Sequence, residues 1–357
     1  MDFLKLRNTT VDEFSSLFSH PLFPLMCPHE YEDNYCNLEP QQIEKVTKLW
    51  KLLNQNRRKK TISITFRGEK KEALRQRLFN SSYNDASNSK LASRIFYFGD
   101  KAKHYFSAEG VGRERLFESI NDVSASAFET IFNELSRILS AEYSSQRVSQ
   151  SIKNFSAENP DFIDYFQAAE NQGSFVDKAV AIEDVELLRN YYLYLLHTFG
   201  GKRFSKSSLF ISTSEDPGLA RNFALSNRNE SVNGRSIIYV CFFPREVRSH
   251  GISILTVQKL LKKYQRAGLP TYSTDLYKQN EISIKGGLFP QFLFGYFDLE
   301  NYCFVVNPYI FDPSVTVEEI VNNGLKIDQS DFHSRIRETD FQRYLWAIED
   351  NFSEYYV

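Results

Sequence analysis

The feature that most constrains this chain is an apolar run from Arg235 to Phe243, RSIIYVCFF, which Pro244 ends. A run of this length and composition fits a central strand of a β-sheet. Four shorter segments with a strand pattern accompany it: SLFIS before the run, and EISI, QFLFGYF and YCFVV after it. The second half of the chain is therefore expected to be rich in strands.

The first half has a different pattern. A helix is expected over about 41–54, and the segment KTISITFRGEK that follows it alternates apolar and polar side chains as a strand does. From about 70 to 205 the sequence is mostly helical, with an apolar stripe over 128–139 and a later helix that Gly200 and Gly201 end. A strand, a helical block and a strand-rich half are the order of an α+β fold, rather than of alternating βαβ units.

Composition and charge exclude several classes of protein. Of the 357 residues, 42% are hydrophobic and 31 are Phe, so the chain has ample material for a core and is not globally disordered. A net charge of -2 argues against binding of a polyanion by the protein as a whole. Whether one region of the protein binds a polyanion depends on the local distribution of charge.

Cysteine usage and hydropathy bear on the compartment. The four cysteines are few and scattered, and the N-terminus MDFLKLRNTT has no apolar stretch of signal-peptide length. No segment approaches the roughly 18 apolar residues of a membrane span. We therefore expect a reduced, cytoplasmic protein that contains no disulfide framework and does not enter a membrane.

His20, Cys27, His29 and Cys36 lie close together in a loop-rich segment, 1–40, that four prolines interrupt. Mixed cysteine and histidine ligands suit zinc, but structural zinc sites usually contain tighter Cys-x2-4-Cys pairs. We expect a proline-rich N-terminal lid with incidental cysteines and histidines, and no metal.

Polar residues that could take part in catalysis or ligand binding lie at the ends of three expected strands. Arg67 closes ISITF, three hydroxyl residues (Ser212, Thr213 and Ser214) close SLFI, and Glu281 opens EISI. Taken alone, each has an ordinary structural explanation: a surface charge for the arginine, a turn or helix cap for the hydroxyls, and a solvated edge position for the glutamate. It is less common for all three features to occur in one chain in this order.

Together these pieces resemble the ADP-ribosyltransferase superfamily, in its Arg–Ser–Glu branch. The matching segments are TFRGE around Arg67, FISTS ending at Ser214, and the Gln-x-Glu motif Gln279-Asn280-Glu281. Phe66-Arg67-Gly68, with LLHTFGGKRFSKSSLFISTSEDPGLARNFA downstream, is also similar to the FRG domain. That domain has the same broad fold and is common in bacterial conflict systems.

The middle motif of the FRG domain usually ends in a Leu-Asp-Trp-type sequence, whereas this chain has Ile-Ser-Thr-Ser. This departure brings the chain nearer to active transferases. The likeness covers about 60–68 and 190–310. It implies a core of two packed β-sheets in a domain over 41–310. The mostly helical stretch at about 70–205 would be a large insertion in this domain, and neither it nor the two termini match the family. A C-terminal helical extension would follow over 311–357.

The resemblance implies NAD as co-substrate, without a metal. Arg67, next to Gly68, would anchor the diphosphate and ribose, because a guanidinium offers a fixed fork of charged donors. Glu281 would stabilise the positive charge that develops on the ribose when the nicotinamide bond breaks. Ser212 would hold Glu281 and the nicotinamide ribose, while Thr213 and Ser214 brace the strand end.

Two aromatic positions have weaker assignments. Phe223 could pack on nicotinamide, although an aromatic at helical spacing is more often part of a core. His197 precedes the two glycines in the FRG-like stretch and could line the nicotinamide pocket. The alternative for His197 is a plain helix-end position, where a histidine suits the helix dipole.

Gln279 bears on the acceptor. In this superfamily, Gln at that position is associated with amide, thiol or nucleobase acceptors rather than with arginine. Residues 51–77 contain ten Lys or Arg against two acids, and a second basic run includes Lys259, Lys262 and Lys263. Basic residues around a cleft suit the phosphate backbone of a nucleic acid, so a nucleic-acid acceptor is favoured over a protein acceptor. Of the nucleic acids, RNA is favoured over DNA. The alternative is a solvated basic face that only attracts NAD.

The sequence thus predicts an NAD-dependent mono-ADP-ribosyltransferase that modifies a macromolecular acceptor, as a bacterial toxin or anti-phage effector does. A neutralising antitoxin protein is the further partner that such a toxin implies. Two alternatives stay open: an NAD glycohydrolase that uses water as acceptor, and a non-catalytic binding module with the same fold.

Overall fold

The chain forms two units that interrupt each other in the sequence, as the computed structural model shows. The first unit comprises Met1–Ser107, Ile211–Gly251 and Ile284–Val357, and the second comprises Ala108–Phe210 and Ile252–Ser283. The structure describes residues 24–29, 33–79, 87–100, 123–143, 150–199, 210–225, 235–244, 251–273, 281–285 and 288–326.

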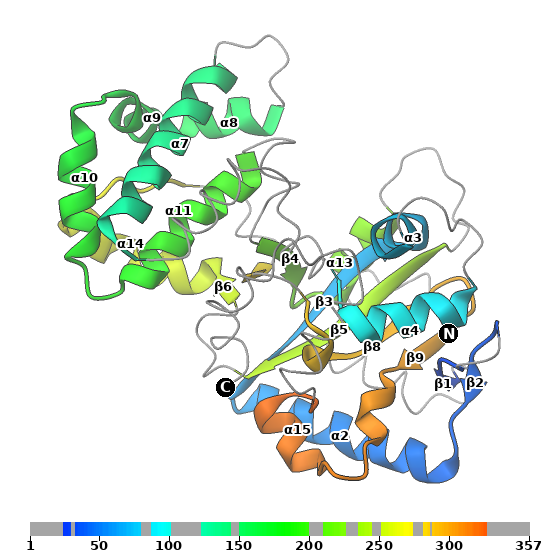
Figure 1. Cartoon of the computed structure of the whole chain (residues 1–357). Helices are drawn as coiled ribbons and strands as arrows, with labels where there is room; N and C mark the ends of the chain where they lie inside the picture. The colour runs from blue at the N-terminus through cyan, green and yellow to red at the C-terminus, as the bar shows by residue number, and fades with distance from the viewer. Residues whose placement is uncertain are drawn as a thin grey trace. The chain divides into compact units, whose positions relative to one another are not determined.

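The first unit is built around two long antiparallel strands, β3 (Ile62–Lys70) and β5 (Ser236–Pro244) (Figure 1). They pair over their whole length, from Ile62 opposite Pro244 to Lys70 opposite Ser236. The interior of β5, from Ile237 to Phe242, is fully buried. This burial on both faces explains why the apolar run of β5 is continuous rather than alternating.

The other strands extend this pair on both sides. The sheet order is β2-β1-β9-β8-β5-β3-β4-β7-β6. The pairing of β1 with β9 is parallel, whereas β8 pairs antiparallel with both β5 and β9, so the sheet is mixed. The bounds are β1 (Leu25–Cys27), β2 (Cys36–Asn37), β4 (Phe210–Ser214), β6 (Gly251–Ser253), β7 (Glu281–Lys285), β8 (Leu293–Asp298) and β9 (Cys303–Val306).

The α+β class predicted from the sequence is confirmed. The two packed sheets are not found among the described strands, which share one sheet because β3 pairs with β5 on one edge and with β4 on the other. Of the expected C-terminal helical extension, the structure describes α15 (Val317–Asn323), which follows a short 3-10 turn at Pro308–Phe311. Residues 327–357 lie outside the described part.

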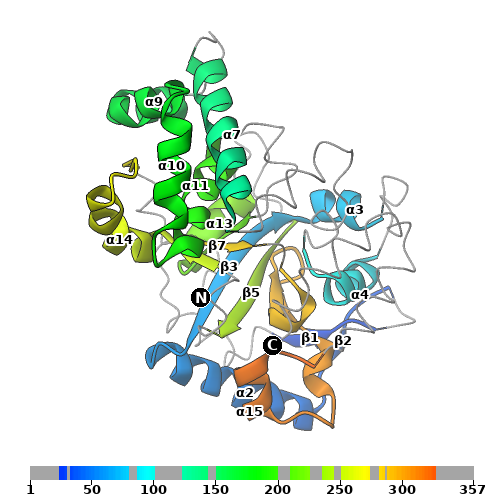
Figure 2. The ribbon, with the colours of Figure 1, turned by 60° about the vertical axis from the view of Figure 1, so that its left-hand side comes forward.

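One face of the sheet is covered by α2 (Pro40–Arg58) and α15, which lie side by side in Figures 1 and 2. Their core is apolar and continuous with the inward side chains of β3 and β5. A capping box between Glu39 and Gln42 and a proline at the first position fix where α2 begins. The remaining helices of this unit are α3 (Lys71–Phe79), α4 (Asn88–Phe98) and α13 (Pro217–Leu225).

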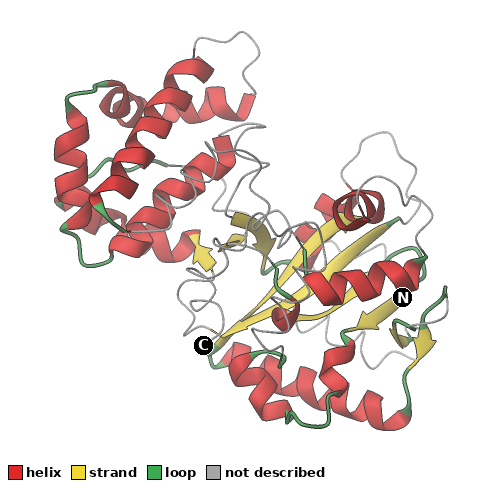
Figure 3. Ribbon diagram, in the orientation of Figure 1, coloured by secondary structure: helices red, strands yellow, loops and turns green. Residues whose placement is uncertain are grey.

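The second unit is mainly helical, as the colours of Figure 3 make clear. Aromatic rings from four of its helices form its core, with ring centroids 5.1–5.3 Å apart along the series Phe132, Phe166, Phe175 and Tyr192. Its helices are α7 (Ala125–Tyr143), α8 (Gln150–Glu158), α9 (Pro160–Gln167), α10 (Asn171–Val180), α11 (Val185–Phe199) and α14 (Ile254–Arg266). The predicted helical block over 70–205 thus divides, with α3 and α4 in the first unit.

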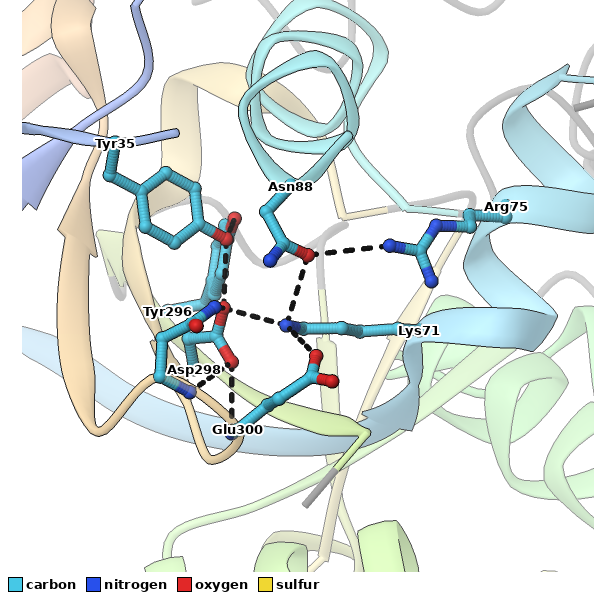
Figure 4. Close-up of polar contacts among 8 residues, drawn as sticks. Tyr35, Lys71, Arg75, Asn88, Tyr296, Asp298 and Glu300 are labelled. Atoms are coloured by element: carbon cyan, nitrogen blue, oxygen red, sulfur yellow. Dashed lines mark hydrogen bonds and ion pairs between the residues drawn. The ribbon is translucent and has the colours of Figure 1, made fainter. Parts of the chain in front are cut away.

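A buried ion-pair network joins several elements of the first unit (Figure 4). The ammonium of Lys71, fully buried at the start of α3, lies 2.7 Å from both Asp298 Oδ2 and Glu300 Oε2. It also donates to Asn88 at the start of α4, 3.2 Å away. Tyr35, just before β2, donates to Asp298 over 2.8 Å. The network therefore ties α3, α4 and the segment before β2 to the end of β8.

None of the helices within the described ranges has the length and apolar character needed to cross a membrane.

Gly68 is required where α13 crosses β3. A Cβ at this position would lie 1.8 Å from the carbonyl oxygen of Ala220 and 2.7 Å from the amide nitrogen of Ala224. Both obstacles are backbone atoms of α13, which cannot rotate away as a side chain can. The glycine thus allows the helix to pack directly on the strand.

We predict that Gly68→Ala lowers the free energy of unfolding of the first unit by about 3 kcal/mol, because α13 has to shift. Gly173→Ala in α10 is the control, since a Cβ there meets nothing within 4 Å. It should instead stabilise the second unit by about 0.5 kcal/mol. Urea unfolding of both variants measures the difference. Wild-type stability of Gly68→Ala would refute the close approach.

Candidate active site

Arg67 lies on β3 beside Phe66, which pairs with Ser214 of β4. Its Nη1 donates to the carbonyl oxygen of Ser212 over 2.7 Å. Its Nε lies 3.4 Å from Asp100 Oδ2, and its Nη2 is paired with the carboxylate of Glu69. The side chain of Arg67 is only 13% exposed. Arg67 is therefore an internal tie between β3 and β4, rather than a surface charge.

Asp100 supplies the buried counter-charge for Arg67. Its side chain is 1% exposed. Its backbone exchanges two hydrogen bonds with Leu288, at 2.9 and 3.0 Å. Gly99 precedes it with a φ of 74°, and a Cβ there would lie 1.9 Å from the carbonyl oxygen of Leu288. The backbone thus fixes the carboxylate at the position where it meets the guanidinium.

The three hydroxyl residues at the end of β4 differ in what they do. Thr213 and Ser214 are buried, and Ser212 contributes its backbone oxygen to Arg67. Ser214 Oγ accepts a hydrogen bond from the amide of Asp216 over 3.0 Å. Asp216 in turn accepts from the amide of Gly218 over 2.8 Å, in the first turn of α13. Ser214 and Asp216 therefore shape the turn from β4 into α13, which is the structural explanation for a hydroxyl at this position.

Glu281 begins β7, and the two hydroxyl groups that contact its carboxylate belong, like Glu281 itself, to the second unit. Its Oε2 accepts a hydrogen bond from the phenol of Tyr194 on α11 over 2.7 Å, and its Oε1 accepts one from Ser283 Oγ over 3.0 Å. Tyr194 itself is buried. Two hydroxyl donors, one for each oxygen, orient this carboxylate.

Tyr194 and Ser283 were not predicted as site residues. Tyr194 lies in the apolar helix NYYLYLLHTF, where a tyrosine indicates core packing. Its one sequence signal is its place three residues before His197, a spacing of about one helical turn. The side chain of His197, the whole of Gln279 and the side chain of Lys259 lie outside the described residues.

The remaining predicted residues lie at the surface. Phe223 is 57% exposed on α13, so it is not a core aromatic. Lys262 is exposed on α14. Lys263 is paired with Glu183 and Asp184, and these carboxylates raise the pKa of Lys263. Its positive charge is thus largely compensated.

The predicted basic segment 51–77 also has less surface charge than its composition suggests. Lys71 is fully buried between two carboxylates, and Arg67 is paired with two others. Of its other members, Lys51 is exposed within α2, and Arg58, Lys59 and Lys60 are exposed at the end of α2 and just after it. Three of these four exposed cations lie at the end of this helix.

The N-terminal Cys/His group is partly described. Cys27 and Cys36 contact each other, and the backbone of His29 exchanges two 2.7 Å hydrogen bonds with the hydroxyl of Ser89. His20 lies outside the described residues. Across the described ranges, no three His, Cys, Asp or Glu residues are grouped as a metal ion would require.

No protein-family model, curated protein or solved structure matches this chain.

We predict that Arg67→Ala lowers the free energy of unfolding of the first unit by about 3–5 kcal/mol, because the buried carboxylate of Asp100 then loses its guanidinium partner. Arg67→Lys keeps the charge but not the three-way fork, and should cost about 1–2 kcal/mol. The fluorescence of buried Trp50 during urea unfolding reports on this unit. If Arg67→Ala unfolds like the wild type, the tie between the strands contributes nothing.

Proposed function

We propose that this chain is an NAD-dependent mono-ADP-ribosyltransferase. The observation that carries the proposal is the carboxylate of Glu281, which Tyr194 and Ser283 hold by one hydroxyl on each oxygen. Its support from the sequence is the resemblance of the segments around Arg67, Ser212 and Glu281 to the Arg–Ser–Glu transferases.

The proposed reaction needs a fixed negative charge. The bond between C1′ of the ribose and the nicotinamide nitrogen breaks, and its electron pair leaves with nicotinamide. Positive charge then develops on the sugar, and an oriented carboxylate stabilises it electrostatically. The acceptor attacks C1′ and gives up its proton. In this proposal Glu281 supplies the charge, and Tyr194 and Ser283 keep it in place.

We assign Arg67 to the NAD diphosphate. The guanidinium suits this anion, but Glu69 and Asp100 are already paired with it. A bound diphosphate would replace at least one of these carboxylates. This pairing also favours a second candidate function, a non-catalytic binding module in which Arg67 has only a structural role.

For the acceptor we propose nucleic acid, RNA before DNA, selected by Gln279. An amide both donates and accepts hydrogen bonds, as recognition of a base edge requires. Arg58, Lys59, Lys60 and Lys262 are among the exposed cations that could contact phosphates. The proposed biological role is that of a cytoplasmic bacterial toxin or anti-phage effector, with an antitoxin protein as its neutralising partner.

Glu281→Gln tests the catalytic assignment. We expect NAD consumption to fall by on the order of a hundredfold, because the charge is lost while the side-chain shape is kept. Unfolding by urea should be nearly unchanged. Glu186→Gln, at an exposed position of the first turn of α11, is the matched control and should keep wild-type activity. Equal turnover by Glu281→Gln and the wild type would favour the binding module.

Gln279→Ala tests the division of roles within the Gln-x-Glu motif. We expect loss of labelling of macromolecules by radiolabelled NAD, with slow NAD hydrolysis retained, because Glu281 is still present. Treatment of the wild-type product with nuclease or protease identifies the acceptor class. Parallel loss of hydrolysis and transfer would contradict the separate role of Gln279. Wild-type protein that hydrolyses NAD without labelling any acceptor would be an NAD glycohydrolase.

A further inference from the structure

Two cysteines face each other in the short hairpin formed by β1 and β2. Cys27 and Cys36 are directly opposite in the antiparallel register. Their sulfur atoms are 3.0 Å apart, and Cys36 Sγ lies 3.5 Å from the carbonyl oxygen of Cys27. All four cysteines of the chain are free thiols in this structure. The contact therefore brings together two reduced sulfur atoms that nothing in the proposed function uses.

The hairpin geometry suits a covalent bond between them. Opposite residues of an antiparallel pair have Cα atoms about 4.5–5.5 Å apart, and disulfides accept Cα separations of about 4.4–6.8 Å. The sulfur atoms need to approach by only about 1 Å to reach the usual bond length. We propose that Cys27 and Cys36 are a thiol-oxidation site, at which a small disulfide such as oxidised glutathione creates a reversible intramolecular disulfide.

The reaction is a two-step thiol–disulfide exchange. One cysteine, as its thiolate, attacks a sulfur of oxidised glutathione and releases one reduced glutathione. The other cysteine then attacks the mixed disulfide and releases the second. The two protein thiols lose two electrons and two protons in total, and one molecule of oxidised glutathione becomes two molecules of reduced glutathione. Reduced glutathione or dithiothreitol reverses both steps.

The other two cysteines differ from this pair. Cys241 and Cys303 are buried, whereas Cys27 and Cys36 are partly exposed. Burial and the neighbouring Cys36 raise the pKa of Cys27 to about 12. The thiolate of Cys27 is therefore scarce at neutral pH.

The disulfide would act on the neighbouring ion-pair network. Tyr35 immediately precedes Cys36, and its hydroxyl reaches Asp298, the partner of Lys71 (Figure 4). A covalent bond between β1 and β2 would restrict the hairpin that carries this tyrosine. The site thus links thiol oxidation to the anchoring of the N-terminal strands on the first unit.

The test uses the full wild-type chain in glutathione buffers of increasing oxidised fraction. After acid quenching and alkylation, non-reducing peptide mapping by mass spectrometry reads the state of each cysteine. We expect a Cys27–Cys36 cross-linked peptide that exceeds the glutathione adducts of these cysteines by at least about tenfold, because the second thiol is already in contact. Dithiothreitol should remove the cross-link.

Three variants make the assignment specific. Cys27→Ser and Cys36→Ser should each lose the cross-link and leave a glutathione adduct on the remaining cysteine. Cys303→Ala, which removes a cysteine of the adjacent strand β9, should keep it. The proposal is overturned if the folded wild type carries only separate adducts or free thiols at Cys27 and Cys36, or if either residue cross-links to Cys241 or Cys303.

Discussion

The first unit depends on the buried ion pair between Lys71 and Asp298. An ammonium without water around it is tolerable only when carboxylates and hydrogen-bond acceptors surround it, as Asp298, Glu300 and Asn88 do here. Removing one partner from such a pair usually costs about 3–5 kcal/mol. Because Lys71 follows β3 and Asp298 ends β8, this single requirement fixes α3, the β8 turn and the N-terminal hairpin against one another.

Local pattern was sufficient to predict the elements but not their partners. The continuous apolar run of β5 and the alternation in β3 reflect burial on two faces and on mainly one face, so both strands were predictable. The burial of Lys71, by contrast, was not predictable from local pattern. It lies in a basic segment that indicates a solvated face, and only the tertiary fold brings two acids to it from 227 and 229 residues away. Sequence separation of this size leaves no local signal.

The same limit applies to the candidate site. Arg67 and Glu281 were predictable as candidates because each adjoins an apolar strand segment and matches a motif, although β3 continues past Arg67 to Lys70, so Arg67 does not lie at a strand end. The residues that orient them were not, since Asp100 follows an aromatic helix and Tyr194 lies within an apolar one. The single sheet also departs from the two sheets that the resemblance implies. A motif therefore identified residue types here, while packing determined which neighbours hold them.

The two carboxylates that pair with Arg67 are not equivalent toward an incoming anion. Asp100 is 1% exposed and is fixed through its backbone to Leu288, so it cannot move into water. Glu69 is 12% exposed and lies one residue before the end of β3. If Arg67 binds a phosphate, as the proposed function requires, Glu69 is the carboxylate that is closer to solvent and the one expected to be displaced, while Asp100 stays in place. The guanidinium would remain oriented by Asp100 and by the carbonyl oxygen of Ser212, so exchange of one acid for an anion is compatible with the strand junction that Arg67 maintains.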